Sequence, residues 1–131
     1  MRILDTDVCI ALLRGLGHVV DRAEQEADSL ATTSVTAAEL YYGAAKSREP
    51  ARNRVLVTDL LSTLPVLEPG LVAAQQFGSL KASLDRSGER LADADLFIAS
   101  IALAEGALLV TGNRRHFDRI PGLHIEDWIR D

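Results

Sequence analysis

The opening segment MRILDTDVCIALLRG places two aspartates, Asp5 and Asp7, between two apolar runs. Other acids stand at similar junctions later in the chain: Glu39 in TAAELYYG, and Asp93 and Asp95 in LADADLFIA. Carboxylates that are brought together without cationic partners repel one another and raise one another's pKa, so a fold tolerates such a cluster chiefly when a divalent cation binds it. A ligand set made only of oxygen atoms favours Mg²⁺ or Mn²⁺ over zinc.

The elements that must position these acids can be read from the period of the apolar runs. The expected elements are, in chain order, the strand RILD, the helix TDVCIALLRG, a helix over 18–27, the strand SLATTSV, the helix TAAELYYGAAKS, a helix over 51–62, the strand PVLE, a helix over 70–87, the helix DADLFIASIALAEG and the strand ALLV, which leads to TGNRRHF and LHIEDW. This alternation predicts an α/β fold with a central parallel sheet that helices cover on both faces. A length of 131 residues without repeats or a long linker predicts a single domain over residues 1–131.

Sites in parallel sheets lie beyond the carboxyl ends of the strands. Asp5 follows the first strand, and Glu39 lies on the first turn of the helix after the second strand. Asp93 and Asp95 stand at the start of the apolar helix that precedes the ALLV strand. We therefore expect all four carboxylates at one edge of the sheet.

Each acid also has a purely structural interpretation. An aspartate between a strand and a helix is often an N-cap, which would account for Asp5 or Asp7. Thr36 and Glu39 have the spacing of a capping box at a helix that begins at Thr36, and Asp93 could cap the helix that follows it. Capping does not require the acids to share one edge, so the convergence of three chain segments favours a functional site.

Composition restricts the classes of function. The formal net charge of −5 argues against binding of nucleic acid by bulk positive charge, so a polyanionic substrate would need the help of a cation. The single cysteine, Cys9, excludes an internal disulfide and is expected to be a buried packing residue, which suits a reducing compartment such as the cytoplasm. Asp5 and Asp7 interrupt the first apolar run and no run reaches 18 residues, so we expect neither a signal peptide nor a membrane span.

Several motifs occur in a defined order along the chain: D-T-[DN] in ILDTDVCI, A-E-L-x-x-G in SVTAAELYYGAAKS, and both D-x-x-I-A and T-x-N-x-x-x-F in LADADLFIASIALAEGALLVTGNRRHFDRIPGLHIEDW. Together they resemble the PIN-domain family, and most closely its VapC-like ribonuclease toxins, over essentially the whole chain. The resemblance implies a PIN-like three-layer α/β/α sandwich. It also implies a metal-dependent endoribonuclease with Mg²⁺ or Mn²⁺ as its cofactor.

The resemblance carries the family's acids onto Asp5, Glu39 and Asp95. Thr6 and Asn113 match its supporting polar positions. In this interpretation Asp5 and Asp95 hold the principal metal ion, and Glu39 orients or deprotonates the water that attacks the phosphodiester.

Asp93 and His116 match the family's pattern only in part. Asp93 matches only some members of the family and is expected to contribute an outer metal ligand. His116 stands where many relatives have an acid, so the number of metal ions, one or two, stays open. The implied partners are a structured RNA such as a transfer RNA, cut in a single-stranded loop, and a VapB-like antitoxin that binds the apolar helices near the N-terminus and at residues 36–62. The resemblance also implies a homodimer.

Two other functions are open on the sequence alone. ILDTDV also fits the D-x-D start of haloacid-dehalogenase-like phosphatases, in which the first aspartate is a nucleophile. Those enzymes also use a later G-D pair, and no such pair occurs here. A non-catalytic, receiver-like Mg²⁺-binding domain would need a lysine after the last strands, and no lysine follows Lys81. An assay of metal-dependent RNA cleavage separates the three functions.

Overall fold

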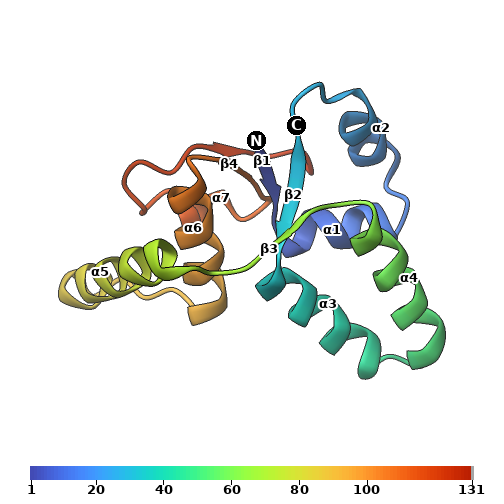
Figure 1. Cartoon of the computed structure of the whole chain (residues 1–131), viewed down its shortest axis with the longest axis horizontal. Helices are drawn as coiled ribbons and strands as arrows, with labels where there is room; N and C mark the ends of the chain where they lie inside the picture. Colours follow the sequence, from blue (N-terminus) through green and yellow to red (C-terminus); the bar gives the residue numbers. More distant parts are fainter. Residues whose placement is uncertain (131) are drawn as a thin grey trace.

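The computed structural model describes residues 1–130, and a parallel five-stranded sheet in the order β3-β2-β1-β4-β5 lies at its centre (Figure 1). The strands are β1 (Arg2–Leu4), β2 (Leu30–Thr33), β3 (Val66–Leu67), β4 (Leu108–Val110) and β5 (Ile125–Glu126). The middle strand β1 pairs with β2 on one side and with β4 on the other. The strand order reverses between β1 and β4, and ligands bind in the crevice beyond the carboxyl ends of strands at such a reversal.

Helices form a layer on each face of this sheet. They are α1 (Thr6–Leu13), α2 (Gly17–Gln25), α3 (Ser34–Ala45), α4 (Pro50–Ser62), α5 (Leu71–Ser87), α6 (Asp93–Glu105) and the short α7 (Arg114–Phe117). In Figure 1, α5 and α6 lie to the left of the strands, and α1, α3 and α4 lie to the right. The predicted three-layer α/β/α architecture with a central parallel sheet is confirmed.

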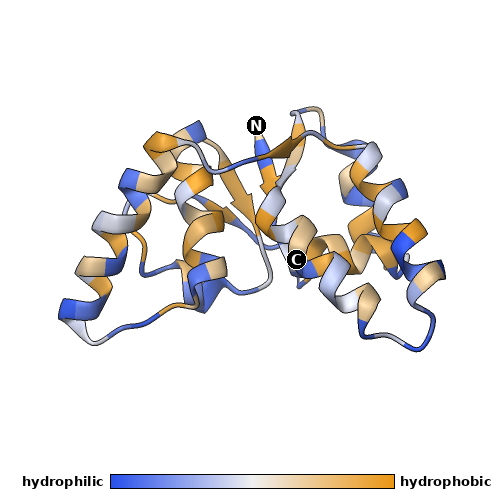
Figure 2. Cartoon of the chain, turned by 60° about the horizontal axis from the view of Figure 1, so that its bottom comes forward, coloured by the Kyte–Doolittle hydropathy of each residue, from blue (hydrophilic) through white to orange (hydrophobic). Residues whose placement is uncertain are grey.

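The sheet divides the hydrophobic core in two, because successive side chains of a strand point to opposite faces. On one face the fully buried Ile3 and Leu109 pack with α5 and α6, where Leu96 is the first buried residue of α6. On the other face Leu4 and Val110 pack with α1, α2, α3 and α4. Figure 2 shows that the strands between the two helix layers are mostly hydrophobic (orange), whereas the loops at the ends of the outer helices are largely hydrophilic (blue).

Helix α6 positions two of the predicted acids. Asp93 and Asp95 lie in its first turn, and the rest of the helix is apolar and largely buried. Phe97 stacks on Phe77 of α5 with ring centroids 4.0 Å apart, so α6 is held between α5 and the sheet. The helix runs antiparallel to β4, which it precedes, and its first turn therefore lies at the carboxyl edge of the sheet.

Helix α3 begins earlier than predicted. Thr33 is its N-cap, with Oγ1 accepting a hydrogen bond from the backbone N of Thr36 at 3.1 Å. Strand β2 therefore ends at Thr33 instead of continuing to Val35, because the chain passes directly from strand to helix. The predicted start at Thr36 and its capping box with Glu39 are wrong, and Glu39 lies on the second turn of α3.

The other elements lie within about two residues of their predicted bounds. Strands β3 and β5 are short and stand at the two edges of the sheet. Within residues 1–130, no helix combines the length and the apolar character that crossing a bilayer requires.

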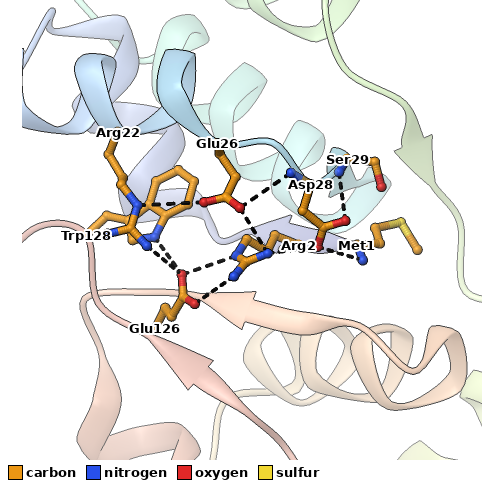
Figure 3. A network of polar contacts seen from close by, with 8 residues as sticks. All are labelled: Met1, Arg2, Arg22, Glu26, Asp28, Ser29, Glu126 and Trp128. Atoms are coloured by element: carbon orange, nitrogen blue, oxygen red, sulfur yellow. Dashed lines mark hydrogen bonds and ion pairs between the residues drawn. The ribbon is translucent and has the colours of Figure 1, made fainter.

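A polar network anchors the last strand to the start of the chain (Figure 3). Arg2 donates to Glu126 Oε2 at 3.0 Å and to Asp28 Oδ2 at 2.8 Å. Arg22 of α2 and the indole N–H of Trp128 both donate to Glu126 Oε1, at 3.3 Å and 2.9 Å. The hydrogen bond from Arg2 lowers the pKa of Glu126. This network fixes the direction in which the segment after β5 leaves the sheet.

Candidate metal-binding active site

Asp5 lies at the end of the middle strand and is only 2% exposed. It is the N-cap of α1, as one structural interpretation predicted, with the backbone N of Thr6 donating to Oδ1 at 2.8 Å. Thr111 Oγ1 donates to Oδ2 at 2.7 Å. Burial, with smaller contributions from the charges of Asp7 and Asp95, raises the pKa of Asp5 from 3.8 to about 7 although both hydrogen bonds oppose the change.

Asp95 and Glu39 converge on Asp5 from helices on opposite faces of the sheet. Burial raises the pKa of Asp95, and the charge of Glu39 raises it further. Thr6, at the start of α1, donates through Oγ1 to Glu39 Oε1 at 2.7 Å and so links α1 to α3. The charge of Asp95 thus acts on Asp5, the charge of Glu39 acts on Asp95, and Thr6 contacts Glu39; the catalytic and supporting roles of these residues stay predictions.

These three carboxylates have no lysine or arginine ion-pair partner within residues 1–130. Among residues 1–130, the one basic side chain within 4 Å of these acids is His116, whose Nδ1 lies 3.8 Å from Asp95 Oδ2. A set of oxygen donors without a fixed cation is the chemistry that a hard divalent ion such as Mg²⁺ prefers, so the residues fit a metal. In the described chain no three histidine, cysteine, aspartate or glutamate side chains already stand as a ligand group for one ion. The donor set is present without a formed coordination sphere.

Asp93 and Asn113 make different contacts from those expected. Asp93 is 61% exposed, and its Oδ1 accepts from Lys81 Nζ of α5 at 2.9 Å. Ala92, not Asp93, occupies the N-cap of α6. The role of Asp93 as an outer metal ligand stays a prediction without a supporting contact. Asn113 stands at the N-cap of α7, but its side chain makes no capping hydrogen bond.

Thr111 is a site residue that the sequence did not single out. It follows β4, is fully buried, and donates to Asp5 across the point where the strand order reverses. Its Oγ1 also accepts from the backbone N of Asn113 at 3.0 Å. The signal was present in the T-x-N pattern, whose threonine is Thr111. Thr111 orients Asp5 and shapes the turn that follows β4.

Hydrogen bonds from two distant segments of the chain hold the turn after Thr111. The backbone N of Gly112 donates to Asp7 Oδ2 at 2.8 Å, and Arg130 donates to the carbonyl of Gly112 and, at 3.1 Å, to Asp127 Oδ2. A Cβ at position 112 would lie 2.7 Å from Asp7 Oδ2 and 2.9 Å from Ile129 Cδ1, so a larger residue would displace the Asp7 carboxylate that bonds the turn. Burial raises the pKa of Asp7, whose Oδ1 is buried without a hydrogen-bond partner in the described chain. The second aspartate of the opening segment thus holds the turn that follows β4.

Cys9 and His18 offer no second reactive centre. Cys9 is fully buried, and burial raises the pKa of its thiol to about 12, so it stays a thiol at neutral pH. This confirms the predicted packing role. His18 Nε2 lies 2.7 Å from the carbonyl oxygen of Ile129 and secures the C-terminal segment.

Comparison with known proteins gives a consistent result. The model of the PIN domain family matches residues 2–123. The chain is similar to Ribonuclease VapC of Haemophilus influenzae (38% identity over 127 residues, 96% of both chains) and to the tRNA(fMet)-specific endonuclease VapC of Salmonella typhimurium (39% over 126 residues, 95% of this chain and 96% of the relative). Its fold is similar to a chain in the crystal structure of DNA-bound VapBC from Salmonella typhimurium, with a TM-score of 0.91, 38% identity and 97% of each chain covered.

Proposed function

The chain belongs to the PIN-domain family, and on that premise we propose that it is a metal-dependent endoribonuclease of the VapC type, the toxin of a toxin–antitoxin pair. The observation that carries this proposal is the environment of Asp5, a buried carboxylate at the reversal of strand order with its pKa raised to about 7. Asp95 and Glu39 add negative charge to the same place, and no arginine or lysine of residues 1–130 forms an ion pair with any of the three. A divalent cation accounts for this arrangement.

Each acid has a distinct proposed role. Asp5 and Asp95 would hold Mg²⁺ or Mn²⁺, because burial makes their charged forms costly when no cation is present. A bound divalent ion lowers the pKa of a water molecule and neutralises the charge that develops on the phosphate. Glu39 would orient that water or accept its proton, since Thr6 holds Oε1 and the carboxylate is otherwise exposed. Thr111 keeps Asp5 in its orientation.

The two alternative functions gain no support. The PIN-domain model matches residues 2–123, and the sequence lacks the later G-D pair that haloacid-dehalogenase-like phosphatases use. A receiver-like binding domain would pair its acids with a lysine. Within residues 1–130, the one lysine paired with a predicted acid is Lys81 of α5, which contacts Asp93.

The proposed substrate is a structured RNA such as a transfer RNA. Two of the similar proteins are named tRNA(fMet)-specific endonucleases. Unstacked nucleotides of a single-stranded loop can be splayed out and reach acids at the edge of a sheet, which paired nucleotides cannot do. The cytoplasm, where such RNA is found, is the proposed place of action.

The proposed protein partner is a VapB-like antitoxin, because the similar solved structures include VapBC complexes. A mainly apolar cavity of about 620 Å³ lies between α3 and α4, with Tyr41, Ala45 and Pro50 in its lining. An amphipathic antitoxin helix would fit this groove, which falls within the predicted range 36–62. Ala45→Glu should then weaken co-purification of the co-expressed cognate antitoxin, whereas the exposed Ala82→Glu on α5 should leave it unchanged. If both variants co-purify equal amounts of antitoxin, the antitoxin binds at another surface of the chain.

A homodimer is the proposed assembly of the toxin. Leu71 and Val72, at the start of α5, are 78% and 58% exposed, and apolar surface of this kind is often covered by a partner. Light scattering should show twice the mass of the chain, and Leu71→Asp should shift the protein toward the monomer. A strict monomer at high micromolar concentration would contradict the dimer.

The activity is tested with purified chain, free of antitoxin, and labelled transfer RNA. We expect discrete cleavage products with Mg²⁺ or Mn²⁺ and none with EDTA, and calorimetric titration should show binding of the ion to the protein alone. Uniform degradation of single-stranded polymers without a preferred position would argue against a structured substrate. Cleavage that persists in EDTA would overturn the metal dependence.

A further inference from the structure

A positively charged cavity lies beside the acidic site. Its volume is about 590 Å³, and it lies between α7 and the C-terminal segment. Arg114, Arg115 and His116 line it from α7, and Arg130 lines it from the C-terminal segment. The one acid in its lining, Asp127, is paired with Arg130 at 3.1 Å. In a chain with a net charge of −5, this cavity carries a local excess of positive charge.

The cavity and the acidic site share a wall. His116 lines the cavity, and its Nδ1 lies 3.8 Å from Asp95 Oδ2. Asn113 also lines the cavity, and its backbone N donates to Thr111, which in turn donates to Asp5. The cavity therefore adjoins the acids through His116 and through the Asn113–Thr111 contact.

The arginines of the cavity differ in their availability. Arg130 is engaged with the carbonyl of Gly112 and with Asp127, so it forms part of the wall. Arg114 and Arg115 are exposed, and their guanidinium groups make no hydrogen bond or ion pair with residues 1–130. These two side chains offer unengaged donors in the fork geometry that binds phosphate oxygens in pairs.

We propose that this cavity binds backbone phosphates of the RNA strand next to the bond that is cut, with Arg114 and Arg115 as the phosphate-binding side chains. The inference deepens the proposed function and rests on it. The acids that would hold a metal ion also repel the neighbouring phosphates, which a single ion at the cleavage point does not neutralise. Cations one step along the strand offset that repulsion and fix which phosphodiester meets the acids, because backbone contacts set the register of a bound strand.

The test is RNA binding by an inactive background, the Asp95→Asn protein, measured as anisotropy of a fluorescein-labelled single-stranded RNA at several salt concentrations. Arg114→Ala/Arg115→Ala should weaken binding roughly tenfold at low salt. The slope of log Kd against log salt should fall by about 1.4, because each phosphate contact on a single strand contributes about 0.7. The matched control is Arg14→Ala/Arg48→Ala, which removes the same charge from exposed positions beyond the C-terminal ends of α1 and α3. It should bind within about twofold of the background, with a smaller loss of slope.

A lysine variant and a cleavage assay distinguish loss of phosphate binding from loss of structure or of activity. Arg114→Lys/Arg115→Lys retains the charge without the fork geometry, so it should restore the salt slope and recover part of the binding, whereas loss of α7 structure would not be rescued in this way. Mg²⁺-dependent cleavage of labelled transfer RNA by the wild-type chain is measured in parallel. If the wild type cleaves and the alanine variant binds like the control with the same salt slope, the cavity proposal is overturned and the proposed function stands. If the wild type does not cleave, the proposed function fails, and the cavity proposal fails with it, because it concerns the phosphates next to the bond that is cut.

Discussion

Replacing Asp5 with asparagine should stabilise the metal-free protein at neutral and alkaline pH. Folding raises the pKa of Asp5 from 3.8 to about 7, so the folded state binds a proton more tightly than the unfolded state does. The stability that this group contributes is complete below about pH 4 and is lost as the pH rises to about 7. Above pH 7 the wild type carries the full cost of a buried, unpaired carboxylate.

The size of the effect follows from that shift. About three pKa units correspond to roughly 4 kcal/mol at about 1.36 kcal/mol per unit. Asparagine has the same shape and keeps an acceptor for the Thr6 backbone N, but its amide alters the contact with Thr111, which costs about 1 kcal/mol. We expect Asp5→Asn to be more stable than the wild type by about 3 kcal/mol at pH 8, or roughly 10 °C in Tm for a domain of this size. At pH 5 the advantage should fall below about 1 kcal/mol.

The assay is differential scanning calorimetry in EDTA at both pH values. Asp21→Asn, which removes an exposed carboxylate of α2, is the matched control and should change stability by less than about 0.5 kcal/mol. Added Mg²⁺ should reverse the order, because a ligand that binds only the folded state stabilises the wild type and the variant has lost a ligand. Equal Tm values of Asp5→Asn and wild type at pH 8 in EDTA would refute the reasoning from burial.

Three other substitutions test the surroundings of Asp5. Gly112→Ala should lower the free energy of unfolding by about 2 kcal/mol in urea denaturation, because its Cβ would meet Asp7 Oδ2 at 2.7 Å, and an unchanged midpoint would mean that the turn can open freely. Thr111→Val removes a hydrogen bond to the Asp5 carboxylate, so the pKa of Asp5 should rise above about 7 in metal-free protein, as an NMR titration would show; a fall would contradict it. Asp95→Asn should raise the Tm in EDTA by a few degrees, or about 1 kcal/mol, and lower it relative to wild type in Mg²⁺; equal shifts in both buffers would indicate a purely structural Asp95.

The fold was predictable because its signals are local. Buried strands such as ALLV and the apolar helix that carries Asp95 show their period within a few residues, and alternation of the two implies the parallel sheet. The shared edge of Asp5 and Asp95 then follows from topology. The start of α3 was not predictable from TTSVT, because Thr33, Ser34 and Thr36 are all good N-cap residues. Thr33 is the N-cap because β2 ends there.

Contacts between distant parts of the chain were not predictable. The hydrogen bond between Gly112 and Asp7 joins residues more than 100 positions apart, and no local sequence pattern predicts such a contact. The pairing of Asp93 with Lys81 depends on how α5 packs against α6. Asp5 itself combines both kinds of information, since it is an N-cap by local sequence and a site residue by its burial among other acids.

The central claim is that Asp5, Glu39 and Asp95 form a metal-dependent site for RNA cleavage. The most direct measurement is the rate of Mg²⁺-dependent cleavage of transfer RNA by purified wild type, Asp5→Asn, Asp95→Asn and the exposed control Asp21→Asn. We expect the two site variants to be slower by at least about 100-fold with native circular dichroism, and Asp21→Asn to stay within about twofold of wild type. Retained cleavage by a pure Asp5→Asn/Asp95→Asn double variant would contradict the claim.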